Sequence, residues 1–173
     1  MMTLGTKSLI ELMLPRSFWK LSQDVNGYSN DSCNELATQV CSGRSFMILA
    51  ESSSNTQNAI TYQVILLEDG YKCWLKFSDL LESVVQIFNW KSKLFTPKQI
   101  KAKIPLVMKW IENSSMINNR YLWGGTLGPD FDCSGLIQTA FASESIWIPR
   151  DAFQQEMFCK NLHITLKDLH KLE

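Results

Sequence analysis

The fold of this chain is constrained most strongly by residues 121–135, which read Tyr-Leu-Trp-Gly-Gly-Thr-Leu-Gly-Pro-Asp-Phe-Asp-Cys-Ser-Gly. The glycines and the proline before Asp132 exclude regular secondary structure in the first part of this stretch. From Leu136 onward, apolar residues recur at helical spacing. The sequence therefore predicts a tight loop that leads into a helix, with Asp132 as the N-cap and Cys133 in the first helical turn.

Cys133 would have the properties of a nucleophile at this position. Near the start of a helix, the macrodipole and the free backbone N–H groups favour a thiolate. Ser134 and Gly135 are small enough to let a substrate carbonyl approach the backbone, where the N–H of Cys133 could help to hold an oxyanion. On composition alone, a cysteine is more often an inert buried residue. The loop and helix around Cys133 are what make it a candidate.

Length and charge limit the possible partners. A chain of 173 residues is long enough for one domain of ordinary size or two small ones. Basic and acidic residues number 17 each, and no run of like charge exceeds a few residues. The sequence therefore predicts no nucleic-acid partner, because a phosphate backbone would find no basic patch.

The sequence shows neither a leader peptide nor a membrane span. Charged residues interrupt the apolar ones near the N-terminus, and no stretch approaches the roughly 20 apolar residues that a span needs. The five cysteines are odd in number and include no CxxC pair, which fits neither a disulfide framework nor a zinc site. We therefore expect a reduced, cytoplasmic protein that needs no metal and no membrane.

Residues 17–83 carry the signals of short strands joined by turns. The predicted strands cover residues 17–21, 45–50, 60–67 and 71–75. Each is apolar or alternating and is bounded by turn residues. Asn26-Gly27 is typical of a turn, and Asp69-Gly70 of a hairpin. About five short strands in about 60 residues predict a small β barrel.

Residues 84–96 are interpreted as a connecting segment, whose large aromatic residues predict that the two parts of the chain pack together. A helix is predicted from Pro97, because Thr96 is a good N-cap and Gln99 can complete a capping box. Its predicted core face consists of Ile100, Ile104, Val107, Met108 and Ile111. Pro105 is expected to break or kink this helix.

Three motifs in residues 121–155 resemble the NlpC family of cell-wall cysteine endopeptidases. They are the loop Tyr-Leu-Trp-Gly-Gly-Thr at 121–126, the nucleophile motif Asp-Cys-Ser-Gly at 132–135, and Pro-Arg-Asp-Ala-Phe-Gln-Gln at 149–155. The earlier strands resemble the bacterial SH3-like barrel that precedes the peptidase domain in some of these enzymes. The resemblance implies an α+β protein. It would have an SH3-like barrel (17–83), a connecting segment (84–96) and a papain-like α+β domain (97–173) that is incomplete at its C-terminus.

The resemblance also implies a mechanism. In this family, a cysteine thiolate attacks an amide of the peptidoglycan stem peptide, with a histidine as the base and a third polar group that orients the histidine. Cys133 would be the nucleophile, and Ser134 would contact the substrate. Tyr121 would place its hydroxyl near the oxyanion, although a packed loop aromatic is an equally good interpretation. No cofactor is implied.

The same resemblance suggests residues that bind the substrate. Asp151 matches an acidic residue that binds the free α-ammonium of an N-terminal L-alanine in family members that trim cut stem peptides. Arg150 is a further candidate. From the barrel side, Tyr71 could add a hydroxyl, and either Glu68 or Asp69 a second carboxylate. From position alone, Arg150 is an ordinary surface charge and Asp151 is the cap of the next helix.

The implied reaction is hydrolysis of the γ-D-glutamyl–diaminopimelate bond in stem peptides, as in cytoplasmic turnover of the cell wall. The family's catalytic histidine lies on a later strand, and this chain is expected to end at Glu173 before that strand. His163 and His170 are interpreted as surface residues. Without an adjacent base, turnover should be severely reduced.

Two alternatives remain open at this point. The chain could be a catalytically incomplete remnant or a muropeptide-binding protein. It could also be a related thiol acyltransferase or amidase that uses the same nucleophile. The sequence gives no indication of the oligomeric state.

Overall fold

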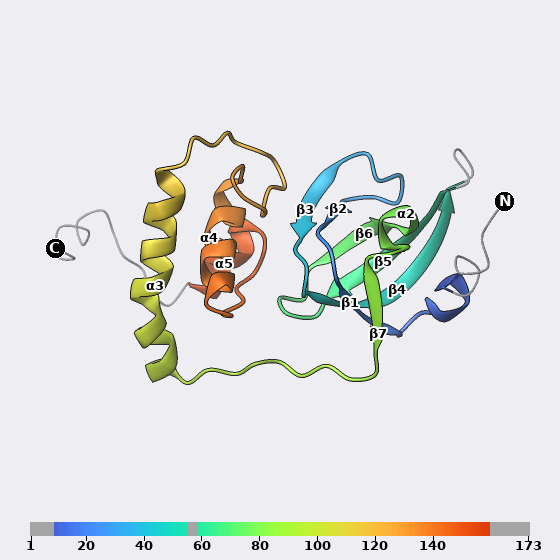
Figure 1. Ribbon diagram of the computed structural model, residues 1–173, viewed down its shortest axis with the longest axis horizontal. Helices are drawn as coiled ribbons and strands as arrows, with labels where there is room; N and C mark the ends of the chain where they lie inside the picture. The colour runs from blue at the N-terminus through green and yellow to red at the C-terminus, as the bar shows by residue number, and fades with distance from the viewer. Residues whose placement is uncertain (1–8, 55–58, 160–173) are drawn as a thin grey trace.

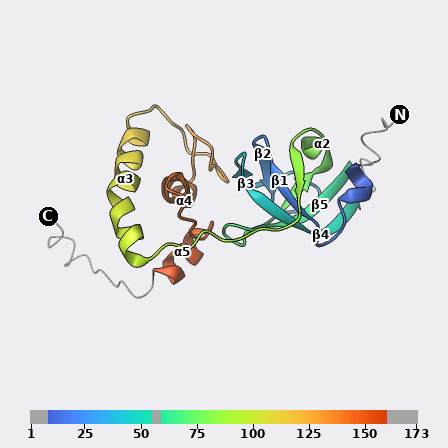
Figure 2. The same cartoon turned by 60° about the horizontal axis from the view of Figure 1, so that its bottom comes forward.

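The computed structural model describes residues 9–54 and 59–159, whose elements form two groups that lie side by side (Figure 1). Seven strands between Phe18 and Ile87 form an antiparallel sheet, and the long helices follow it in the chain. The predicted α+β class is therefore confirmed. Figure 2, turned by 60°, shows the connecting segment running from the sheet to α3.

The sheet has the strand order β3-β2-β6-β5-β4-β1-β7, so β3 and β7 are its edges. Its strands are β1 (Phe18–Leu21), β2 (Val25–Tyr28), β3 (Leu36–Val40), β4 (Ser45–Ser54), β5 (Ala59–Leu66), β6 (Lys72–Lys76) and β7 (Val84–Ile87). The short helix α2 (Phe77–Leu80) follows β6. Alternate strand residues point inward and form one core, in which Trp19, Phe46 and Tyr62 are the largest fully buried side chains. Met13, from the segment before β1, completes this core.

The structure contains three strands that the sequence analysis does not predict: β2, β3 and β7. Asn26-Gly27 lies inside β2 and not in a turn. Gly27 is needed there for close packing, because a Cβ atom would lie 2.9 Å from the Cys73 sulfur. β7 lies within the predicted connecting segment, where it pairs with β1. That pairing is a long-range contact that local sequence does not reveal.

Helix α3 (Pro97–Ser115) begins as predicted. Thr96 accepts a hydrogen bond from the Gln99 backbone, and the Gln99 side chain accepts one from the Thr96 backbone at 2.8 Å, so the capping box is present. Pro105 does not break the helix, which continues past it to Ser115. Proline removes only one N–H donor, and the turns on both sides keep the helical path.

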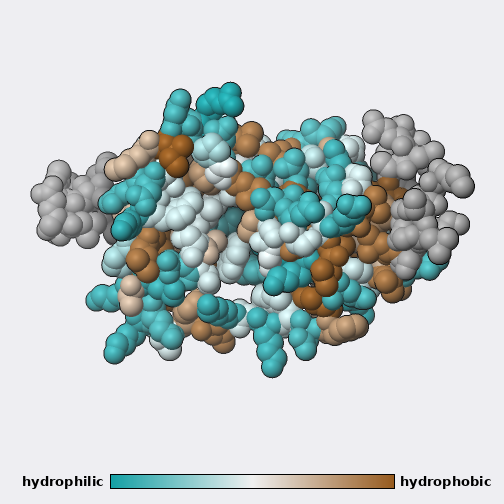
Figure 3. Space-filling model, viewed as in Figure 1, coloured by the Kyte–Doolittle hydropathy of each residue, from teal (hydrophilic) through white to brown (hydrophobic). Residues whose placement is uncertain are grey.

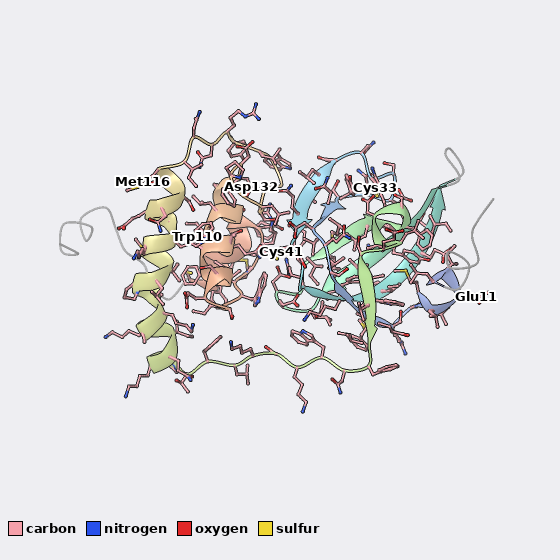
Figure 4. All side chains as sticks on the ribbon, viewed as in Figure 1. Glu11, Cys33, Cys41, Trp110, Met116 and Asp132 are labelled. Carbon is pink, nitrogen blue, oxygen red and sulfur yellow. The ribbon has the colours of Figure 1, made fainter. Side chains whose placement is uncertain are left out.

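The predicted core face of α3 is buried only in part. Val107 is 1% exposed, whereas Ile104 and Met108 are 36% and 51% exposed. Trp110 contacts Phe131 edge to face, with ring centroids 5.8 Å apart, at the side of α3 that faces α4 (Cys133–Ser143) (Figure 4). A Lys103–Glu144 ion pair of 2.7 Å joins the same two helices. The surface shown in Figure 3 is largely hydrophilic, with separate apolar patches.

The two groups of elements pack together. Of the aromatic residues in the connecting segment, Phe88 is 91% exposed, whereas Trp90 and Phe95 are half-buried and line a cavity with Glu68 and with residues of α4. Further contacts are made by β3 and by the turn before β6. Gln39 is hydrogen bonded to Thr126, and the Asp69 carboxylate accepts a hydrogen bond from Gln138 at 2.9 Å. In the described part of the chain, no helix has the length and apolar character of a membrane span.

Candidate active site

Asp132 organises both the predicted loop and the start of α4. Its Oδ1 accepts a hydrogen bond from the Gly135 N–H at 2.6 Å, which confirms the predicted N-cap. Its Oδ2 accepts one from the Gly124 N–H at 2.9 Å, and its own N–H donates to the Gly125 carbonyl. Gly124 has φ +78°, which favours glycine. One carboxylate, labelled in Figure 4, therefore fixes the loop against the helix that carries Cys133.

Arg150 forms an ion pair with Asp132 inside the protein. Its Nη2 and Nη1 donate to the two carboxylate oxygens at 2.6 and 3.1 Å. Burial by itself would raise the pKa of Asp132. Hydrogen bonds from Arg150 and from the Gly135 N–H, together with the Arg150 charge, hold this pKa below its ordinary value. Asp132 is therefore ionised at neutral pH.

Cys133 is exposed at the N-terminus of α4 and lines a pocket of about 520 Å³. The pocket lies between the barrel and the loops around α4. Predicted site residues in its lining are Tyr71, Tyr121, Cys133, Ser134, Arg150 and Asp151. The structure thus brings together residues that are up to 80 positions apart, from Tyr71 to Asp151.

Tyr121 and Trp123 flank the cysteine and are 65% and 67% exposed. A parallel bridge joins Tyr121 to Phe131, and the Leu122 N–H donates to the Phe131 carbonyl at 3.1 Å. This pairing holds the Tyr121 loop beside the nucleophile loop. Tyr121 is therefore not an aromatic residue packed inside the loop, because most of its surface is open to solvent.

Ser134 and Arg150 reach the pocket, but their polar groups are occupied within the protein. Ser134 Oγ donates to Asp132 and accepts from Arg150 Nη1 at 3.0 Å. Arg150, only 3% exposed, also donates to the Thr38 hydroxyl at 3.2 Å and to the Ala37 carbonyl at 3.3 Å. Their predicted contact with substrate stays a prediction, and the hydrogen bonds observed here are the ones that a buried guanidinium requires. Both side chains support the loop.

Asp151 occupies the N-cap position of α5 (Ala152–Phe158), but its side chain makes no capping hydrogen bond. Its carboxyl group lines the pocket with Tyr71. Burial raises the pKa of Asp151; the nearby charges of Asp132 and Asp69 also raise it, and Arg150 and Tyr71 oppose the shift. Burial, aided by the Asp151 charge, raises the pKa of Tyr71 to about 12. The Tyr71 hydroxyl therefore remains a donor at neutral pH.

The barrel carboxylate at the pocket is Glu35, and not Glu68 or Asp69. Glu68 lies 3.3 Å from the Arg44 guanidinium, and Asp69 pairs with the same arginine at 2.8 Å. Both are drawn away from the pocket by this buried cation. Glu35 lines the pocket and accepts a hydrogen bond from the Ser29 hydroxyl at 2.8 Å. In the sequence, Glu35 looks like any other loop acid, because only the packing of the barrel brings it to the site.

The two histidines lie outside the described residues, so the structure does not place either of them. Within residues 9–54 and 59–159, no three His, Cys, Asp or Glu side chains gather in a way that could hold a metal ion. The described lining of the pocket offers a thiol, phenols and carboxylates.

An exposed cysteine on the first turn of a helix, facing an open pocket, defines the kind of site that thiol nucleophiles use in papain-like proteins. The comparisons with known proteins agree with this class. Residues 118–171 match the NlpC/P60 family, and residues 28–80 match the bacterial dipeptidyl-peptidase Sh3 domain. These two segments are therefore similar to the NlpC/P60 family and to a bacterial SH3 domain, respectively.

One curated relative is a dipeptidyl-peptidase by name. The chain is 33% identical to the Gamma-D-glutamyl-L-lysine dipeptidyl-peptidase of Bacillus cereus (strain ATCC 10987 / NRS 248) over 101 residues. The match covers 58% of this chain but only 26% of the relative. The matched part of the chain therefore corresponds to about a quarter of that protein's length.

Proposed function

We propose that this chain carries the nucleophile and the amine-binding wall of a cysteine peptidase that cleaves peptidoglycan stem peptides. The observation that carries the proposal is the pocket, which places exposed Cys133 at a helix N-terminus opposite carboxylates from both halves of the molecule. The family match of residues 118–171 supports it. The base of the reaction is not among the described residues, none of which is a histidine.

In the proposed reaction, the Cys133 sulfur attacks the carbonyl carbon of the scissile amide. The N–H of Cys133 belongs to the first turn of α4 and has no partner within the helix, so it can donate to the developing oxyanion. The Tyr121 hydroxyl, across the pocket, is the second proposed donor. The C–N bond then breaks, the diamino acid leaves as an amine after taking a proton from the protonated base, and the acyl group remains on Cys133 as a thioester. Water hydrolyses this thioester, which releases the acyl part of the peptide as a carboxylic acid and restores the thiol.

Asp151 and Glu35 form the proposed site for the substrate's free α-ammonium. Both line the pocket, and within the described residues neither makes an ion pair. A cationic group that enters would be paired there with carboxylate, and the Tyr71 hydroxyl could add a hydrogen bond. Such a site requires a peptide that has already been cut, and this fits a role in peptide turnover in the cytoplasm.

The proposed scissile bond joins γ-D-glutamate to diaminopimelate in a peptide that begins with L-alanine. The relative's printed name specifies a γ-D-glutamyl-L-lysine bond for that protein. A tripeptide with either third residue is therefore a suitable substrate for the test. Release of the free diamino acid, measured by mass spectrometry, would show hydrolysis, and Cys133→Ala should abolish it while Cys159→Ala should not. Binding with neither release of the diamino acid nor acylation of Cys133 would contradict the peptidase and favour a muropeptide-binding protein.

Cys133 is expected to react with iodoacetamide at neutral pH at least about ten times faster than Cys159. Both thiols are exposed, but Cys133 begins α4 whereas Cys159 is the C-cap of α5. Free backbone N–H groups surround the sulfur at the start of α4, whereas carbonyl oxygens lie near the sulfur at the end of α5. Peptide mapping after timed alkylation gives both rates in one sample. Equal rates would mean that Cys133 is not activated.

Asp151→Asn is expected to weaken capture of a peptide with a free amine by about ten-fold or more, since it removes a charge-assisted hydrogen bond. The N-acetylated peptide should be affected much less. Capture is measured as protection of Cys133 from alkylation. Because burial raises the pKa of Asp151, protection should fall at a pH above the ordinary value of 3.8 as the carboxylate gains a proton.

The matched control is Asp79→Asn, which removes a carboxylate from α2, away from the pocket. This variant should discriminate between the two peptides as the wild type does. If Asp151→Asn also kept that discrimination, the amine-binding role of Asp151 would be wrong.

A further inference from the structure

The free edge of the barrel sheet is covered by the segment that carries the active-site loop. β3 is an edge strand, and an exposed edge leaves backbone groups without partners. Here, the Gln39 N–H donates to the Thr126 hydroxyl at 3.2 Å, and the Gln39 carbonyl accepts from that hydroxyl at 2.5 Å. The Ala37 carbonyl accepts from Arg150. The loop therefore takes the place that a further strand would occupy.

The Gln39 side chain strengthens this attachment. Its Oε1 accepts hydrogen bonds from the N–H groups of Thr126 and Leu127 at 3.2 and 3.1 Å. The Thr126 carbonyl in turn accepts from the Thr139 hydroxyl on α4 at 2.9 Å. Thr126 is thus held between the barrel strand and the nucleophile helix. In Figure 1, β3 is the strand that faces α4.

Arg150 makes a second connection between the same two elements. Its Nε donates to the hydroxyl of Thr38, which is fully buried on β3. Its two Nη atoms donate to the Asp132 carboxylate, which caps α4 immediately before Cys133. The planar guanidinium fixes the distance and angle between these partners, and a lysine could not reproduce that geometry.

We infer that Arg150 is a positioning residue that connects the nucleophile helix to strand β3. The barrel would then hold Cys133 in place in addition to lining the pocket. The inference rests on the proposed function only for the role of Cys133. If the Arg150–Asp132 pair is lost, the Asp132 charge is no longer compensated and opposes a thiolate on the adjacent residue. Changes on β3 should therefore alter the reactivity of a thiol about 95 residues later in the chain.

The test measures the alkylation rate of Cys133 in the full chain at neutral pH. Thr38→Val keeps the shape of the side chain but removes the acceptor of Arg150 Nε, and should slow Cys133 by about three-fold. Arg150→Met should slow it by about ten-fold, because the helix that carries Cys133 loses its connection to β3. Arg150→Lys keeps the charge and should fall between the wild type and Arg150→Met. In the double variant with Thr38→Val and Arg150→Met, Cys133 should be alkylated no more slowly than in Arg150→Met alone, because both changes act on one connection.

Two matched controls separate this effect from general damage. Thr61→Val removes another buried barrel hydroxyl, which hydrogen bonds to the Asp31 carbonyl and not to Arg150. Arg120→Met removes an 88% exposed arginine that pairs with Asp130. Both should leave the Cys133 rate within about two-fold of the wild type, as expected for sites away from the network.

The buried thiols of Cys33 and Cys73 report on folding in the same samples, since they react only when the barrel opens. If the Cys33 and Cys73 thiols become reactive in Arg150→Met, the role of Arg150 is decided by Thr38→Val and Arg150→Lys instead. Wild-type rates at Cys133 in these folded variants would overturn the inference. A wild-type Cys133 that reacts no faster than Cys159 would instead contradict the proposed function, and Thr38→Val would still show whether β3 affects this thiol.

Discussion

Gly135→Ala is expected to destabilise the protein by about 3 kcal/mol, as overpacking next to rigid backbone does. Gly135 lies in the first turns of α4, where alanine would normally stabilise a helix by about 1 kcal/mol relative to glycine. In this fold, however, an added Cβ atom would overlap the carbonyl oxygen of Gly125 and approach Asp132 Oδ1 to 3.0 Å. The sign of the effect is therefore reversed by the loop that packs on the helix.

Urea denaturation measures this change in the free energy of unfolding. Gly43→Ala is the matched control, because its Cβ would meet no atom within 4 Å and would only oppose the left-handed backbone at φ +88°. That conformation costs about 1–2 kcal/mol. We also expect slower alkylation of Cys133 in Gly135→Ala, since the Gly125 carbonyl must move away from Asp132. A Gly135→Ala protein as stable as the wild type would show that the loop does not lie against α4.

Asp132→Ala is expected to cost about 3–5 kcal/mol, which is typical when one partner of a buried ion pair is removed. The substitution leaves the Arg150 guanidinium, 3% exposed, without its anion and also removes the cap of α4. The control is Asp130→Ala in the same loop, whose partner Arg120 is 88% exposed. A surface pair contributes at most about 1 kcal/mol. Equal losses in the two variants would contradict the buried pair.

The stability that Asp132 contributes should decrease as the pH falls into the acidic range. The pKa of Asp132 lies below the ordinary value of 3.8 in the folded protein, so its contribution is fully present above pH 3.8. It is lost as the pH falls through the lower pKa of the folded state. The difference in unfolding free energy between the wild type and Asp132→Asn should therefore shrink below about pH 3.8. A difference that stays constant down to pH 2 would argue against this ionised pair.

Local sequence predicts a structure best where that structure depends on a few neighbouring residues. The N-cap at Asp132 and the capping box at Thr96 are local hydrogen bonds between residues three positions apart, and both are present. The strands with clear alternation were also predicted. β3 and β7 were missed because their pairing partners, and not their own patterns, make them strands.

The candidate site also has one part that local sequence predicts and another part that depends on long-range packing. The sequence by itself determined the position of Cys133, because a glycine-rich loop, an N-cap and an apolar helix are all encoded within about 20 residues. Only the tertiary structure decided the partners of that thiol. It turned Glu68 toward Arg44, brought Glu35 to the pocket and buried Arg150 against Asp132. The physical reason is that a charged side chain takes its partner from whatever element packs beside it, and that element can lie 100 residues away in the chain.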